Sequence, residues 1–161
     1  MYYATSSSDF LTHEVLKTLS GLDAMQRIAT GDLPAPAMAE TMAIRMVEAS
    51  AGRVVFEGVP EFRHTNPAGT IHGGWFGAIL DSCMSCAVQS MLPAGRAYTT
   101  LEYKVNLVRP LFADGTAVLA EGTSLHTGRR TATAEGRLTG VEDGKLYATG
   151  TVTCMIFDVS D

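Results

Sequence analysis

One carboxylate stands alone in the most apolar part of the sequence. Asp81 lies within HGGWFGAILDSCMSC, residues 72–86, and no cationic residue is near it in the sequence. Burying a carboxylate without a partner is costly, and aspartate is seldom fully buried unless something compensates its charge. The position therefore indicates either a chemical role for Asp81 or a structural carboxylate that bonds a backbone amide or a neighbouring chain.

The same segment contains a pair of cysteines that in another setting would suggest redox work. Cys83 and Cys86 form a C-x-x-C motif, and Cys154 is the third cysteine of the chain. The pair lies in the middle of an apolar segment, whereas reactive thiols are found at exposed helix starts. Only Cys154 remains to complete a four-ligand zinc site. We therefore expect neither redox chemistry nor a metal, and three cysteines without a disulfide framework fit a reducing compartment.

A long helix is expected to carry Asp81. It is predicted from Gly73 to about Met91, where PAG ends it, and it is apolar on nearly all sides, so it must be covered on nearly all sides. After this helix, apolar residues recur at every second position, as in a β-strand. In TLEYKVNLVRP one face of a strand is predicted to carry Leu101, Tyr103, Val105 and Leu107.

Further strand-like runs lie on both sides of the predicted helix. ETMAIRMVEA and RVVFEGVP, joined by the turn SAG, precede it. Three more runs follow the alternating strand, and their connectors HTGR and EDG suit hairpins between antiparallel neighbours: Thr116 to Leu125, Arg130 to Val141 and Lys145 to Phe157. A single curved antiparallel sheet wrapped around the helix would cover it.

The N-terminal part has a different pattern. From Ser8 to about Thr30, apolar residues mostly recur at three- and four-residue steps. This spacing predicts an amphipathic helix or two, broken at SGL, and GDLPAPA then forms a stiff connector.

Composition excludes several classes of function. The chain has 161 residues, of which 46% are hydrophobic and 18% charged, as in an ordinary single-domain globular protein. Its net charge of -5 argues against binding to nucleic acid. No window reaches the roughly 18 uncharged apolar residues of a membrane span, and MYYATSSSDFLTHEV does not have the pattern of a secretory signal. We therefore expect a cytoplasmic protein.

The segment around Asp81 resembles a known family signature. NPAGTIHGGWFGAILDSCMSCAV, residues 66–88, is similar to the signature of the hotdog-fold acyl-CoA thioesterases, specifically the phenylacetic acid degradation (PaaI-like) group. The matching features are Asn66 six residues before His72, the pair Gly73-Gly74, and an acidic residue nine positions after His72. TTLEYKVNLVRPL and GRR resemble the group's later strands.

The resemblance covers roughly Glu40 to Phe157 and implies an α+β hotdog fold. In this fold a curved antiparallel β-sheet is wrapped around a long central α-helix. Residues 1–38 would form an N-terminal helical extension, which only some members have, and residues 39–161 would form the thioesterase domain.

Helix geometry makes a strong demand on any shared site. A helix turns about 100° and rises about 1.5 Å per residue, so His72 and Asp81 would lie on roughly opposite faces and about 13 Å apart. If both act in one reaction, a second subunit must supply one of them. The family's active site across a two-fold interface meets this demand. We expect a homodimer with shared active sites that pairs into a tetramer, by either sheet or helix packing.

The resemblance also assigns catalytic roles. The Gly73 N–H at the helix start would polarise the thioester carbonyl. Asp81 would be the general base for water, or the nucleophile through a short-lived anhydride. Asn66 would orient the water or the thioester. His72 would fix the loop and the Gly73 amide, and Ser85 would hydrogen-bond the carboxylate or the attacking water.

Further residues are expected to bind the substrate, whose coenzyme A phosphates need local basic groups. Arg129 and Arg130 are the best candidates for these phosphates, and Arg63 and His64 are weaker ones. The other residues expected at the substrate are Gly74, Trp75, Thr99 and Thr100. No separate cofactor is implied, because coenzyme A is part of the substrate.

Each of these residues also has a structural interpretation. Asn66 before a proline could be a turn residue, and His72 could satisfy local amides. Ser85 could be a small packing residue, and Arg129 with Arg130 a solvated hairpin pair.

The predicted function is hydrolysis of an acyl-CoA, with an aryl or medium-chain acyl group, to free acid and coenzyme A. Two alternatives are an acyl-CoA sensor or binding module and a hotdog hydratase or dehydratase. The hydratase would normally pair a histidine and an acid in one site. Sensors with the hotdog fold usually carry a DNA-binding domain as well, and no basic recognition helix is evident in this sequence.

Overall fold

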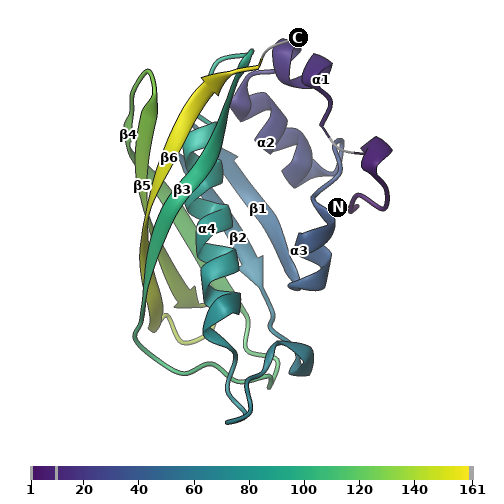
Figure 1. Cartoon of the computed structure of the whole chain (residues 1–161). Helices are drawn as coiled ribbons and strands as arrows, with labels where there is room; N and C mark the ends of the chain where they lie inside the picture. Colours follow the sequence, from purple (N-terminus) through teal and green to yellow (C-terminus); the bar gives the residue numbers. More distant parts are fainter. Residues whose placement is uncertain (1, 10, 160–161) are drawn as a thin grey trace.

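The computed structural model of the chain describes residues 2–9 and 11–159, and within them a six-stranded antiparallel sheet wraps around one long helix, as Figure 1 shows. The helix α4 spans Gly73–Gln89. The strands are β1 Ile44–Ser50, β2 Arg53–Gly58, β3 Arg96–Leu107, β4 Val118–Thr127, β5 Thr131–Gly140 and β6 Leu146–Asp158. The predicted α+β fold, a curved sheet around a central helix, is confirmed.

The strand order is β1-β2-β4-β5-β6-β3, with antiparallel pairing throughout. The predicted hairpins put β1 beside β2, and β5 between β4 and β6. However, β3 does not lie beside β4, the next strand in the chain. Residues 108–117 instead lead from β3, which pairs with β6, to β4, which pairs with β2. The twelve-residue β3 is therefore an edge strand of the sheet.

The helix α4 packs on the sheet through close backbone contacts. Its buried positions occur all around its axis, because the sheet covers most of the helix and other segments of the chain pack against the rest. Gly122 of β4 permits the closest approach, because a Cβ there would lie 2.2 Å from the backbone oxygen of Cys83. The sequence places a residue without a side chain where helix and strand backbones meet.

The N-terminal segment, residues 2–41, folds against the edge of the sheet formed by β1. It contains a 3₁₀ turn Ser7–Asp9 and the helices α1 His13–Thr18, α2 Gly21–Thr30 and α3 Ala37–Thr41. The predicted break at SGL is confirmed by the gap between α1 and α2. The first strand was expected to begin near Glu40, but α3 occupies that position and β1 starts later. Met1 and Phe10 of the predicted extension, like Ser160 and Asp161, lie outside the described residues.

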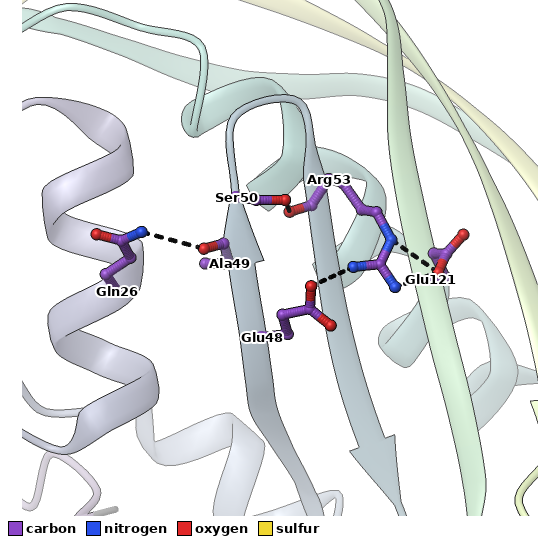
Figure 2. Close-up of polar contacts among 6 residues, drawn as sticks. All are labelled: Gln26, Glu48, Ala49, Ser50, Arg53 and Glu121. Atoms are coloured by element: carbon purple, nitrogen blue, oxygen red, sulfur yellow. Dashed lines mark hydrogen bonds and ion pairs between the residues drawn. The ribbon is translucent and has the colours of Figure 1, made fainter.

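Two hydrogen bonds attach α2 to the rest of the fold. The Gln26 Nε2 donates to the Ala49 oxygen of β1 at 3.3 Å, as Figure 2 shows. The Gly21 N–H at the start of α2 donates to the Leu92 oxygen at 2.9 Å, just beyond the end of α4. The helix is thus fixed to the sheet edge and to the central helix.

A small ionic network joins the first strands of the sheet. In Figure 2, the Arg53 guanidinium of β2 contacts Glu48 of β1 and Glu121 of β4, the latter through Nη2 at 2.6 Å. All three side chains are at least one third exposed, so the network is expected to add little to stability.

No helix of the described residues is both long and apolar enough to cross a membrane.

Candidate active site

One stripe of α4 faces the edge strand β3. Its members recur every four residues, the spacing that keeps side chains on one helix face: Gly73, Gly77, Asp81 and Ser85. Their neighbours on β3 run in the opposite direction along the sequence: Leu107, Tyr103, Thr100 and Tyr98. The antiparallel course of helix and strand therefore places a short row of polar and small residues between them.

A β-bulge decides which threonine reaches Asp81. Opposite β6, Thr100 pairs with Cys154 and Glu102 pairs with Thr153, so Leu101 is an extra residue on β3. An extra residue reverses which side chains face the helix. As a result Thr100 and Tyr103 both face α4, although their separation is odd. Thr99 is exposed, and the sequence left open which threonine would act.

Asp81 is half-buried and has one hydrogen-bond donor in the described part of the chain. The Thr100 hydroxyl donates to the Asp81 Oδ1 at 3.0 Å. No lysine, arginine or histidine of the described residues forms an ion pair with this carboxylate. Burial raises the pKa of Asp81, and the bond from Thr100 opposes that shift. A carboxylate with a raised pKa and an uncommitted oxygen is suited to accept a proton from water.

Ser85 supports the helix next to Asp81 instead of bonding its carboxylate. The Ser85 hydroxyl donates to the backbone oxygen of Asp81 at 2.6 Å and is only 4% exposed. It accepts a hydrogen bond from the Tyr98 hydroxyl at 3.0 Å. Burial raises the pKa of Tyr98 well above its usual range, which keeps the phenol protonated as a donor. Sequence analysis did not single out Tyr98, whose signal is its place two residues before Thr100.

The three thiols are held in their neutral form. Burial raises the pKa of Cys86 to about 12 and of Cys154 to about 11, and it raises the pKa of Cys83 well above the usual range. Because the thiolate is the reactive form, these side chains are poor nucleophiles. Within the described residues, the His, Cys, Asp and Glu side chains form no cluster that could hold a metal ion.

Asp81 borders a cavity of about 380 Å³, here called the Asp81 cavity. Ser82, Ser85, Cys86 and Tyr98 line it beside Asp81, and residues of β1, β2 and the N-terminal segment line the remainder. Asp81 is therefore the carboxylate that α4 presents to an otherwise largely apolar space.

The start of α4 holds a second group of predicted site residues. The His72 Nδ1 accepts a hydrogen bond from the Gly74 N–H at 2.9 Å. We predicted that His72 fixes the Gly73 amide, but its partner is the Gly74 amide. The reason is that an N-cap side chain reaches the second or third amide of a helix. The Gly73 N–H has no acceptor within the described part of the chain. It is a free donor at the positive end of a 17-residue helix.

Asn66 shapes the loop that leads to this helix start. Its Oδ1 accepts from the Ala68 N–H at 2.9 Å and the Thr70 N–H at 3.3 Å, and its Nδ2 donates to the Thr70 Oγ1 at 2.8 Å. Asn66 and Gly73 line a surface pocket of about 310 Å³, here called the Gly73 pocket, with Phe76 and Leu107 among its other walls. The structure therefore brings Asn66 and Gly73 together but separates them from Asp81.

Two other predicted residues serve the core. Trp75 is 2% exposed, its Nε1 donates to the Met42 oxygen at 2.8 Å, and it lines neither of these two spaces. His64 uses both ring nitrogens: Nδ1 accepts from the Glu61 N–H, and Nε2 lies 2.8 Å from the Thr41 oxygen, to which it donates. Its neighbour Arg63 forms an exposed ion pair with Glu61.

The predicted coenzyme A ligands lie at the β4–β5 hairpin. Arg129 and Arg130 are both exposed there. The Arg96 Nη2 of β3 donates to the Arg129 oxygen at 2.6 Å, and Arg96 also pairs with Asp158. Arg96 is thus a further cation at this end of the sheet that sequence analysis did not select.

Comparisons with known proteins give a consistent result. Residues 68–147 match the thioesterase superfamily. A phenylacetic acid degradation-related protein from Ralstonia eutropha is 30% identical, with a TM-score of 0.73 over 81% of this chain and 98% of that one. A mutant of the phenylacetic acid degradation protein PaaI from Thermus thermophilus is 29% identical, with a TM-score of 0.66 over 73% of this chain and 96% of that one.

The PaaI protein of the phenylacetic acid degradation operon of E. coli shares the fold at 20% identity, with a TM-score of 0.74 over 86% of this chain and 96% of that one. Among curated proteins, none matches the chain.

Proposed function

The chain belongs to the thioesterase superfamily, and we propose that within this family it hydrolyses an acyl-CoA thioester to a free acid and coenzyme A. One observation carries the proposal: Asp81 borders an apolar cavity, accepts a hydrogen bond from Thr100 and has a pKa raised by burial. These properties suit a general base that deprotonates water, or a carboxylate nucleophile. Neither of these two roles of Asp81 requires a metal ion.

The Gly73 amide is proposed to stabilise the charge that develops during attack. As the thioester carbonyl carbon becomes tetrahedral, its oxygen becomes an oxyanion. The free N–H of Gly73 at the start of α4 is the donor for that oxygen, and the absence of a side chain lets the thioester approach. His72 keeps the helix start formed through the Gly74 amide, and Asn66 keeps the loop in place through Thr70.

A homodimer is proposed because the two halves of the site do not meet within one chain. Asp81 follows Gly73 by eight residues, which separates them by about 12 Å along the helix, and they line different spaces. The unpaired edge of β3 exposes Leu101, Tyr103 and Leu107, which suits an interface. A partner subunit would supply Asp81 to each Gly73. Pairing of dimers into a tetramer remains part of this proposal.

Arg129 and Arg130 are proposed to bind the coenzyme A phosphates, since both side chains are exposed and neither forms an ion pair within the described residues. The net charge of -5 argues against nucleic acid as the ligand. The three free cysteines support a reducing, cytoplasmic setting.

The test is release of free thiol from a panel of aryl, short-chain and medium-chain acyl-CoAs by the wild type and Asp81→Asn. We expect turnover by the wild type and a loss of at least about 100-fold in kcat for the variant, the range for removal of a general base. Asp114→Asn, which removes an exposed carboxylate outside the cavity lining, is the matched control. A fully active Asp81→Asn would refute the assignment. A melting temperature that depends on ligand, without turnover, would favour a sensor. Formation of a 3-hydroxyacyl-CoA from an enoyl-CoA would favour a hydratase.

A further inference from the structure

The N-terminal segment forms a large part of the wall of the Asp81 cavity. Its contribution includes Leu11, Met25, Ile28, Pro34, Met38 and Ala39. In Figure 1, α2 and α3 lie on the side of β1 that is away from β2, and the start of α2 meets the end of α4. Without these residues, Asp81 would lie at an open surface. The segment thus turns one face of the central helix into a partly open cavity.

This wall is fixed in place by backbone hydrogen bonds. The Ala4 N–H donates to the Ala35 oxygen at 2.8 Å, and the Ala35 N–H donates to the Tyr2 oxygen at 2.9 Å. The Gly21 and Gln26 bonds described above attach α2 to α4 and β1. Met25 and Ile28 are 6% and 7% exposed, which places the inner face of α2 in the core. The cavity is therefore a preformed feature of the fold.

The chemistry of the cavity suits an apolar group. Its hydroxyls are committed: the Ser82 Oγ donates to the Ala78 oxygen at 2.7 Å, and the Ser85 Oγ donates to the Asp81 oxygen. Asp9, the other carboxylate at the cavity, accepts hydrogen bonds from the Thr5 and Ser6 amides, which lower its pKa. Met25, Met38, Met46 and Ile28 are among the other lining residues, and methionine adapts to varied apolar shapes.

The size of the cavity favours a chain over a single ring. A cavity of about 150 Å³ is enough to hold benzene, whereas the Asp81 cavity has about 380 Å³. A phenylacetyl group would leave most of this space unfilled, and unfilled apolar space forfeits packing contacts. An aliphatic chain of medium length would fill it.

We propose that the Asp81 cavity binds the acyl chain and that the N-terminal segment sets its length, which makes medium-chain aliphatic acyl groups the preferred substrates. This inference rests on the proposed thioester hydrolysis. The thioester carbon lies at Asp81, the chain extends along Tyr98 and Cys86, and Met25, Ile28 and Met38 limit its extent from the N-terminal side. These three residues determine specificity and take no part in the chemical step.

The test changes one wall residue in both directions. Met38 is 46% exposed, so its replacement carries little risk to folding. Met38→Trp narrows the cavity and Met38→Ala widens it. Met91, 47% exposed and outside the cavity lining, provides the matched control Met91→Trp. Binding of S-ethyl-, S-phenylethyl- and S-decyl-coenzyme A, thioethers that cannot be hydrolysed, is measured by calorimetry, and thiol release from decanoyl-CoA and acetyl-CoA is measured in parallel.

We expect the wild type to bind the decyl thioether at least about 100-fold more tightly than the ethyl one, since each buried methylene adds roughly fourfold. Met38→Trp should weaken decyl binding at least about tenfold and leave ethyl binding unchanged, while Met91→Trp behaves as the wild type. Equal affinity for the three thioethers, tightest binding of the phenylethyl thioether, or equal effects of the two tryptophan variants would overturn the inference.

The two readouts separate this inference from the proposed function. Chain-length-dependent binding that Met38→Trp abolishes, without thiol release from any acyl-CoA, would support the acyl pocket and overturn the hydrolysis. Thiol release with no dependence on chain length or on Met38 would overturn the acyl pocket and leave the hydrolysis intact.

Discussion

Thr100 donates a 3.0 Å hydrogen bond to the carboxylate of Asp81, and it reaches that position because β3 carries one extra residue at Leu101. The bond joins the central helix to the edge strand at the point where the carboxylate enters the Asp81 cavity. It orients the carboxylate through one oxygen and leaves the other for a water molecule or a substrate. A backbone irregularity in a strand thus sets the geometry of the proposed base.

Replacing Thr100 should change the pH dependence of the reaction. The Thr100 hydroxyl stabilises the ionised carboxylate, so Thr100→Val should raise the pKa of Asp81 further. The acidic limb of kcat/KM should then move to higher pH, with a loss of roughly tenfold at acidic pH and a smaller loss at alkaline pH. Thr100→Ser should restore the wild-type profile. An unchanged limb in Thr100→Val would show that this bond does not tune the base.

Ionisation of Asp81 should lower the free energy of unfolding as pH rises. Its pKa is higher in the folded protein than in the unfolded chain, so the folded state holds the proton more tightly. The free energy of unfolding should therefore fall as pH rises from the ordinary carboxyl value, about 3.9, through the raised folded pKa. Asp81→Asn removes this loss and should be more stable than the wild type at neutral pH, with the gain absent in strong acid. Urea unfolding of the wild type and Asp81→Asn, at neutral pH and in strong acid, measures this gain in stability. A gain that is the same at both pH values would contradict the burial of an ionised group.

Gly73→Ala should preserve the fold and impair turnover. Among the described residues, a Cβ at Gly73 would meet only the Leu107 Cδ1, at 3.4 Å, so the helix start can accommodate it. The methyl group would keep the thioester carbonyl away from the amide, and loss of one oxyanion donor costs about 100-fold or more in kcat. Steady-state kinetics with circular dichroism as the folding control tests this. Normal turnover in a folded variant would remove the Gly73 amide from the mechanism.

Two glycines of the sheet should differ sharply in their tolerance of alanine. At Gly122 a Cβ would lie 2.2 Å from a backbone oxygen of α4, whereas at Gly136 it would lie 2.8 Å from the Cγ of the buried Met84 side chain, which can shift more readily than a helix backbone. Gly122→Ala should cost about 3 kcal/mol or more of the free energy of unfolding, and Gly136→Ala about 1 kcal/mol. Chemical denaturation compares them. Similar losses would mean that α4 moves away from β4 at little cost.

Local patterns in the sequence predicted much of the fold. The apolar helix that carries Asp81 and the hairpins after it follow from periodicity and turn residues, because these signals are confined to short windows. The pairing of β3 with β6 did not follow, since residues 108–117 carry no signal for the strand they lead to. The separation of His72, at the start of α4, from Asp81 did follow, because it depends only on helix geometry.

The details around the site depended on contacts that no short window contains. The bulge at Leu101 arises from pairing with β6, so the strict alternation of apolar residues could not distinguish Thr99 from Thr100. Trp75 follows Gly73 and Gly74 in the sequence, but its indole N–H donates a hydrogen bond to the Met42 oxygen in the core. The contribution of α2 and α3 to the Asp81 cavity likewise needs the packing of the whole chain.

The most direct measurement mixes two inactive variants. If each active site takes Asp81 from one subunit and Gly73 from its partner, a heterodimer of Asp81→Asn and Gly73→Ala contains one intact site and one doubly altered site. Equal amounts of the two variants, unfolded and refolded together, should recover about a quarter of the wild-type rate of thiol release, because half of the dimers are mixed and each has one working site. A mixture no more active than the separate variants would contradict a site shared between subunits.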